Sequence, residues 1–336
     1  MDGDGHIDLI SGSWPGELFL FRGGPGRTFG PPEMMKDKQG EIINIGGAVR
    51  EQSGGGLLIT GNAKFEKTPE GTFVTYKGKR YKSTPEKPVS ITGCASAVHA
   101  VDWDGDGDFD LLVGDIQGDV HVIPNEGTPQ GYAFGKERPL QAGGKPLRVE
   151  GDAGPFAVDW DGDGDLDLLA GAGDGSVSLF RNVGTTRTPE LAAAETLVPP
   201  GGTSFGSDAP KSPRRGIRSK VCATDWDGDG RLDLLVGDFT TQSPDLPEPT
   251  PEEKAKHDEI REEFTKVMEC YSGLVDKLDG LKRAKTKEEA EQVKKEIGEV
   301  RERMQELRSK LPPQFENHGW VWLFLRRPTR AGEGGR

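Results

Sequence analysis

Carboxylates recur at one fixed spacing in this chain. The pattern Asp-x-Asp-x-Asp-Gly-x-x-Asp occurs in three complete copies, DWDGDGDFD, DWDGDGDLD and DWDGDGRLD, and the chain opens on a shorter copy, MDGDGHID. Alternate carboxylates converge on one point only where the backbone curls tightly, and the Gly at the sixth place permits the positive φ of such a curl. A ring of hard oxygen ligands suits Ca²⁺, which takes about six to eight of them. The spacing therefore predicts calcium loops.

The candidate ligands occupy five equivalent positions of each loop. The first, third, fifth and ninth positions offer carboxylates, and the seventh is expected to offer its backbone carbonyl, so its residue type is free to vary. The predicted ligands are Asp102, Asp104, Asp106, Asp108 and Asp110; Asp159, Asp161, Asp163, Asp165 and Asp167; Asp225, Asp227, Asp229, Arg231 and Asp233; and, in the opening copy, Asp2, Asp4, His6 and Asp8. These positions predict three complete Ca²⁺ sites and one incomplete site.

Other readings of the same loops fit less well. Asp-Gly strings by themselves favour plain turns, but here one register recurs in every copy and each copy runs into an apolar strand. An EF-hand loop closes with a Glu at position 12, where this chain has Val113, Ala170, Val236 or Ser11. Mg²⁺ demands a strict octahedron and keeps several waters. Calcium is therefore the predicted ion.

Short apolar strands surround every loop. The segments LISGS, LLVGD, LLAGA and LLVGD follow the loops, a further strand opens in GELFLFR, GDVHVIP and GSVSLFR, and SAVHAV, PFAV and KVCAT lie upstream. A fourth, weaker strand follows near Phe29, Phe134 and Leu191. The copies are spaced by 57 residues (Asp104 to Asp161) and by 66 (Asp161 to Asp227). Four short antiparallel strands at such a period are typical of the blades of a β-propeller.

These loops and strands resemble the FG-GAP, or VCBS, repeat family, known from the integrin α-subunit propeller and from many secreted or surface bacterial proteins. The resemblance implies a β-propeller with calcium bound in hairpin loops, a non-catalytic recognition or adhesion role, and an extracytoplasmic location (secreted, periplasmic or cell surface). Because the opening copy lacks its first ligand and first strand, we expect an N-terminally truncated member, with the signal sequence absent from this chain.

The predicted fold class is all-β, a propeller of four-stranded blades with Asp-rich calcium loops, plus an inserted antiparallel α-helical coiled-coil hairpin. The expected units are a partial blade with the incomplete calcium loop at 1–40, a degenerate blade or an insertion at 41–93, blades at 94–148 and 149–210, a last blade split between 211–249 and 314–330, and the helical insertion at 250–313.

The insertion is predicted from its heptad pattern. Apolar residues from Ile260 to Leu281 and again from Ala290 to Leu311 alternate steps of four and three, which is the seam of a coiled coil. Thr250 and Glu253 form a capping box at the start of the first helix. Two seams joined by a short turn predict a helical hairpin, which serves either as a spacer or as a docking arm for a partner protein.

The remaining composition excludes several classes of function. The net charge of −13 comes without a basic patch, which argues against nucleic-acid binding, and no apolar run is long enough for a membrane span. The three Cys are too few for a disulfide framework. The five His are scattered, and neither His-Glu-x-x-His nor Gly-x-Ser-x-Gly occurs, so no catalytic or cofactor-binding residues are predicted.

The leading hypothesis is a calcium-binding propeller that acts as a non-catalytic recognition or adhesion module for a protein or glycan ligand. Its extracytoplasmic location also follows from the calcium argument, because weak calcium sites fill where the ion is millimolar. The alternative is a calcium-dependent carbohydrate-active enzyme such as a polysaccharide lyase. A cluster of Lys, Arg or Tyr converging in a central cleft would favour that alternative.

Overall fold

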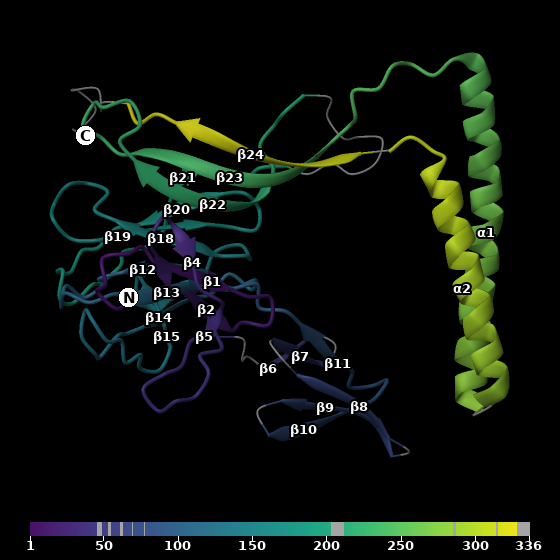
Figure 1. Cartoon of the computed structure of the whole chain (residues 1–336), viewed down its shortest axis with the longest axis horizontal. Coiled ribbons are helices and arrows are strands. Elements are labelled where there is room, and N and C mark those ends of the chain that lie inside the picture. Colours follow the sequence, from purple (N-terminus) through teal and green to yellow (C-terminus); the bar gives the residue numbers. More distant parts are fainter. Residues whose placement is uncertain are drawn as a thin grey trace. The chain divides into compact units, whose positions relative to one another are not determined.

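The chain forms two compact units in a computed structural model that describes residues 1–45, 49–52, 55–60, 63–68, 70–76, 78–202, 212–284, 287–313 and 315–327. The first unit comprises residues 1–204, 213–241 and 317–336, and the second comprises 205–212 and 242–316. The first unit is built from many small sheets and the second contains two helices (Figure 1). The prediction of a mostly β chain with two inserted helices is confirmed.

Two four-stranded antiparallel sheets follow one another in the middle of the chain. Each is a simple meander in which consecutive strands are neighbours. The first sheet contains β12 (Ala97–Val101), β13 (Asp110–Gly114), β14 (Val120–Ile123) and β15 (Arg138–Pro139), and the second contains β18 (Gly154–Val158), β19 (Asp167–Gly171), β20 (Val177–Phe180) and β21 (Glu195–Val198). The short hairpin β16 (Gln141–Ala142) and β17 (Lys145–Pro146) lies between them in sequence.

Two three-stranded sheets repeat part of this arrangement at the ends of the first unit. One contains β1 (Leu9–Gly12), β2 (Leu18–Phe21) and β5 (Glu33–Met34), beside the small hairpin of β3 (Gly23–Gly24) and β4 (Thr28–Phe29). The other contains β22 (Ile217–Thr224), β23 (Asp233–Gln242) and β24 (Glu316–Phe324). The described residues form separate sheets and no closed sheet.

Apolar side chains between successive sheets form the core. Every residue of β13 and of β19 is buried, as their continuous apolar sequences require. Leu111 packs with Leu18 of β2, and on the opposite face Leu112 packs with Leu168 of β19. Leu169 in turn packs with the apolar residues of β22 and β23. Each of the two four-stranded sheets is therefore covered on both faces, by the sheets of the loop-containing repeats before and after it.

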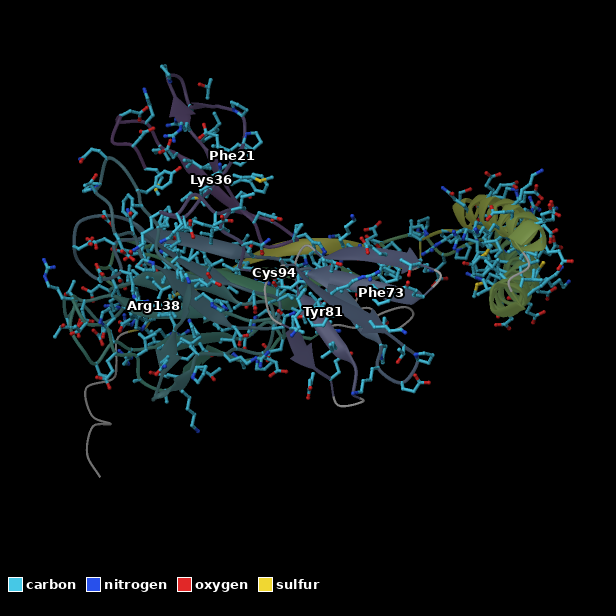
Figure 2. All side chains as sticks on the ribbon, turned by 90° about the horizontal axis from the view of Figure 1, so that it is seen from below. Phe21, Lys36, Phe73, Tyr81, Cys94 and Arg138 are labelled. Carbon is cyan, nitrogen blue, oxygen red and sulfur yellow. The ribbon has the colours of Figure 1, made fainter. Side chains whose placement is uncertain are left out.

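Residues 49–92 are folded differently from the four-stranded sheets. One sheet contains β6 (Val49–Glu51), β7 (Leu57–Thr60) and β11 (Val89–Thr92), and the other contains β8 (Lys64–Thr68), β9 (Gly71–Tyr76) and β10 (Lys79–Ser83). β11 pairs with β7 in parallel, which a meander cannot produce. Phe73 of β9 and Tyr81 of β10 are labelled in Figure 2, and the Arg80 guanidinium lies 3.7 Å from the centroid of the Phe73 ring.

The second unit contains α1 (Pro251–Ala284) and α2 (Lys287–Ser309) packed against each other. The capping box is present, since Glu253 N–H donates to Thr250 Oγ1 at 3.3 Å and Thr250 N–H donates to Glu253 Oε2 at 2.8 Å. An ion pair of Arg303 with Glu263 and a 2.9 Å hydrogen bond from Arg301 to the Tyr271 hydroxyl show that the helices run antiparallel. No helix of the described part combines the length and the apolar character that a membrane crossing needs.

Candidate metal centres

Each complete Asp-rich loop joins the first strand of a sheet to the second. The loops lie between β12 and β13, between β18 and β19, and between β22 and β23, while the opening copy precedes β1. The sixth residue has positive φ in all four copies, at 99° for Gly107, 97° for Gly164, 85° for Gly230 and 86° for Gly5. The tight curl that the sequence predicts is therefore present.

The three complete loops bring carboxylates together. In each loop three carboxylates offer oxygens that all lie within 4.8 Å of one another. The groups are Asp102, Asp104 and Asp106; Asp159, Asp161 and Asp167; and Asp225, Asp227 and Asp229. Like charges this close repel one another by about 1 kcal/mol per pair even in bulk water. A divalent cation at the centre of each group would remove that repulsion.

The 102–110 loop holds the most enclosed of these groups. Oδ1 of Asp102, of Asp104 and of Asp108 is buried and has no hydrogen-bond partner among the described residues. The Asp108 side chain is only 5% exposed, and its pKa is raised by burial and then by the negative charges of Asp106, Asp104 and Asp102. Buried carboxylate oxygens are rarely left without a partner. The donor set, all oxygen and all anionic, fits a hard cation such as Ca²⁺.

The other two complete loops share the same internal bonding. Asp159 accepts backbone hydrogen bonds from Gly162 at 2.7 Å and from Gly164 at 3.1 Å, and Asp225 accepts them from Gly228 at 2.8 Å and from Gly230 at 3.0 Å. The first Asp of each loop therefore fixes the curl.

In the complete loops, arginines contact two of the predicted metal ligands. Arg181 donates to Asp161 at 2.7 Å, and Arg231 forms an ion pair with Asp229. Both arginines are partly exposed, so they can swing away when a cation enters.

The seventh position behaves alike in all four copies. Its backbone N–H donates to the carboxylate at position five, with distances of 3.0 Å for Asp108, 3.1 Å for Asp165, 2.9 Å for Arg231 and 2.8 Å for His6. The carboxylates at this fifth position are those of Asp106, Asp163, Asp229 and Asp4. The backbone N–H of the seventh residue therefore adds a constraint on the loop beside the carbonyl ligand expected from the sequence.

The opening copy does not gather its carboxylates. Asp2, Asp4 and Asp8 form no group of close oxygens, although all three lie in the described part of the chain. Arg22 donates to Asp2 at 2.6 Å and holds the pKa of that carboxyl below its usual range, while the amino group of Met1 donates to Asp8 at 2.7 Å. The predicted incomplete site is thus the least organised of the four.

The closing Asp of each loop has a structural role that the sequence analysis missed. Asp110 accepts backbone hydrogen bonds from Trp103 at 3.1 Å and from Asn125 at 2.6 Å. Asp167 accepts them from Trp160 and Asn182, and Asp233 accepts them from Trp226 and Arg326. These carboxylates tie the start of the loop to the residue that follows the third strand. Burial is the main reason why the pKa of Asp110 is raised to about 6.

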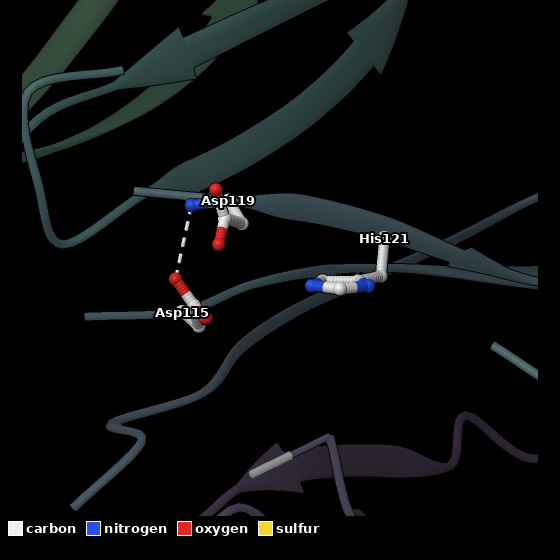
Figure 3. Close-up of side chains that lie close together, drawn as sticks. All are labelled: Asp115, Asp119 and His121. Carbon is white, nitrogen blue, oxygen red and sulfur yellow. Dashed lines mark hydrogen bonds between the residues drawn. The ribbon is translucent and has the colours of Figure 1, made fainter. Parts of the chain in front are cut away.

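A fourth group of possible ligands lies outside the repeats' loops. Asp115, Asp119 and His121 offer atoms within 4.8 Å of one another at the turn from β13 to β14 (Figure 3). Asp115 Oδ1 accepts the N–H of Asp119 at 2.9 Å, and Arg148 lies 3.4 Å from Asp119. The carboxylate of Asp115 therefore closes the turn, and the spacing Asp-x₃-Asp-x-His across a hairpin was the signal that could have revealed this group.

These loops and sheets form repeated β units, each with an acidic loop between its first two strands. The profile of the family described as FG-GAP-like repeat matches residues 102–170 and 159–236, so this part of the chain consists of two overlapping FG-GAP-like repeats. The resemblance inferred from the sequence is confirmed there.

No curated protein matches the chain. A solved structure of an Agrocybe aegerita lectin, described as recognising non-reducing terminal N-acetylglucosamine, is 15% identical, with 70% of this chain covered and a TM-score of 0.28. The match spans 58% of that lectin chain. A likeness at this level does not bear on the fold or the ligand.

Proposed function

We propose that this chain is a calcium-binding β-propeller segment of FG-GAP-like repeats that acts as a non-catalytic recognition or adhesion module. The observation that carries the proposal is the group of crowded carboxylates at the same place in three successive sheets. A site that recurs in every repeat serves stability, because catalysis normally needs one centre. The ions would hold the loop ends of the sheets together and so keep a recognition surface in shape.

The proposed ligands are the carboxylates at positions one, three, five and nine of the complete loops, with the carbonyl at position seven. The unpartnered buried oxygens of Asp102 and Asp104 support this assignment most strongly. Calcium is preferred over Mg²⁺ because a flexible set of four or more anionic oxygens suits its larger shell. When bound, the cation would neutralise the mutual repulsion of these carboxylates.

The proposed blades keep the boundaries predicted from the sequence, and residues 41–93 are assigned to one of the two predicted alternatives. The sheets at 94–148 and 149–210 are antiparallel meanders, as blades are. For residues 41–93 the parallel pairing of β11 with β7 favours an insertion over a degenerate blade. Thermal unfolding with and without a calcium chelator tests the whole proposal: a calcium-dependent rise in Tm is expected, and an unchanged Tm would contradict it.

We propose that the helical hairpin is a spacer. The apolar seam of α2 is buried within the second unit, at Ala290, Val293, Ile297 and Leu307. The role of docking arm for a partner protein is the competing hypothesis. Recovery of the same partners by the intact chain and by a chain lacking 250–312 supports the spacer, whereas their loss with the hairpin supports docking.

One observation favours the second candidate function, a polysaccharide lyase. Arg218 and Lys220 lie together on β22, and burial lowers the pKa of Lys220, which moves that amine toward the role of a base. In such a reaction the base takes the proton next to a uronate carboxylate, a C=C bond forms, and the glycosidic C–O bond breaks with its oxygen protonated. Release of an unsaturated uronate from a polyuronate would establish this activity, and intact polymer after incubation would exclude it for that substrate.

A further inference from the structure

An open cavity of about 750 Å³ lies within the first unit and away from the acidic loops. It is lined by the starts of β12 and β22, the end of β1 and the middle parts of β23 and β24. The charged and large aromatic side chains of its wall include Trp14, Asp152, Arg218, Lys220, Asp238 and Trp320. A cavity of this size accommodates a small organic ligand.

Two residues that line this cavity each carry a buried polar atom with no hydrogen-bond partner among the described residues. One is the donor Nε1 of Trp320, and the other is the acceptor Oδ1 of Asp238. Oδ2 of Asp238 accepts from Gly216 N at 2.6 Å and from Trp322 Nε1 at 2.8 Å, so the carboxylate is held in place with Oδ1 left over. A buried polar group without a partner is energetically costly. Hydroxyl groups can satisfy both atoms, because a hydroxyl donates and accepts.

Charged groups on another part of the wall form a fixed cluster. Asp152 is only 7% exposed and accepts from Arg218 Nε at 2.5 Å and from Lys220 Nζ at 3.2 Å. The terminal nitrogens of Arg218 have no partner among the described residues, and its side chain is half-exposed. The guanidinium is therefore oriented by one nitrogen and offers its other donors to the cavity.

Backbone strain gathers at the same wall. Ala95, Asp152 and Arg218 adopt left-handed φ values of 50°, 43° and 59°. In each case the carbonyl of the next residue lies against a Gly of the preceding sheet. The three positions are thus equivalent in successive repeats. Left-handed non-Gly residues are strained and occur often at ligand clamps. All three of these positions line the cavity.

An exposed aromatic ring completes the wall. Trp14 is 57% exposed and lies against Gly93, where a Cβ would fall 2.0 Å from Cε2 of the ring. Gly93 therefore leaves room for the indole to lie flat, and the rest of the ring is open. A flat apolar face beside several hydrogen-bonding groups matches the surface of a pyranose, which has apolar C–H faces and a rim of hydroxyls.

We propose that this cavity binds a neutral saccharide. The Trp14 ring packs against the sugar, and sugar hydroxyls bond to Trp320 Nε1, to Asp238 Oδ1 and to the terminal nitrogens of Arg218. A neutral sugar is favoured over a uronate because the two acids Asp152 and Asp238 balance the two bases Arg218 and Lys220. This inference rests on the proposed recognition function, for which it names the class of ligand.

The test is binding of the intact chain, in calcium, to an array of neutral and uronate-containing oligosaccharides, followed by calorimetric titration with the best neutral oligosaccharide. Trp14→Ala and Arg218→Gly are each expected to weaken binding at least tenfold, and Trp320→Phe several-fold, since it removes one donor and keeps a ring. Arg218→Gly suits the backbone, because Gly adopts this φ without strain. Phe29→Ala, which removes a similarly exposed aromatic ring elsewhere, is expected to bind like the parent.

Thermal unfolding of the same samples separates this inference from the function on which it rests. No saccharide binding by a chain that keeps a calcium-dependent Tm overturns the saccharide site and leaves the calcium module standing. Binding that survives both Trp14→Ala and Arg218→Gly also overturns the site, and binding of uronates alone overturns the neutral ligand. Saccharide binding with a Tm indifferent to calcium supports the site and contradicts the calcium proposal.

Discussion

Replacing Asp104 by Asn should raise the stability of the metal-free chain and reduce the stabilisation that calcium adds. The substitution keeps the shape of the side chain and removes one charge from a group whose oxygens lie within 4.8 Å of one another. Each like-charged pair at that distance costs about 0.9 kcal/mol in water and more in a partly enclosed loop. Because Asp104 has two such neighbours, the metal-free variant should be about 2 kcal/mol more stable than the parent. For a unit of this size that corresponds to a rise in Tm of roughly 4–8 °C.

The stabilisation that calcium adds should be smaller in Asp104→Asn than in the parent. At a calcium concentration 100 times Kd, binding stabilises the parent by about 2.7 kcal/mol per site, and a tenfold weaker site would contribute only about 1.4 kcal/mol. Scanning calorimetry of both proteins in chelator and in calcium measures the two effects together. Glu86→Gln, which removes one charge from an exposed turn, is the control and should alter neither. A lower Tm in chelator, or an undiminished calcium increment, would refute the assignment of Asp104 as a crowded ligand.

Three further predictions concern other parts of the chain. Asp110→Asn should lower Tm in chelator as well as in calcium, because the N–H groups of Trp103 and Asn125 bond to different oxygens of the carboxylate and Asn offers an acceptor to only one of them. The loss is about 1–3 kcal/mol, and an unchanged Tm in chelator would contradict the structural role. Residues 250–312 belong to the second unit. Their excision, with a short turn joining β23 to β24, should therefore preserve the calcium-dependent unfolding transition. Disappearance of the transition would make the hairpin part of the core. Leu307→Ala should destabilise the hairpin by about 2–5 kcal/mol, because Leu307 is only 1% exposed. Circular dichroism of the helices on heating measures this loss, and an unchanged melting curve would mean that the apolar seam does not hold α2.

The acidic loops and the strands beside them were predictable from the sequence because their signals are local. Gly107 and its equivalents take the positive φ that the Asp-Gly register requires, and the apolar runs after the loops became the buried strands β13 and β19. The capping box of Thr250 and Glu253 is likewise a contact across three residues.

Contacts between segments far apart in the chain could not be predicted from the sequence. The hydrogen bond from Asn125 to Asp110 joins residues 15 positions apart, and it reveals a role for the closing Asp that the metal-loop pattern hides. The parallel pairing of β11 with β7 depends on a crossover that no local pattern marks. Trp14, Asp152 and Trp320 reach one cavity only because the sheets stack, so a list of motifs could not place them together.

The central claim is that the Asp-rich loops bind calcium, and the stoichiometry of calcium binding to the metal-free chain tests it most directly. Titration calorimetry should give about three saturable sites per chain, one for each complete loop whose carboxylates are gathered. Asp104→Asn, Asp161→Asn and Asp227→Asn should each weaken or remove one of these sites and leave the other two. Absence of saturable calcium binding, or a stoichiometry that the three substitutions leave unchanged, would contradict the account.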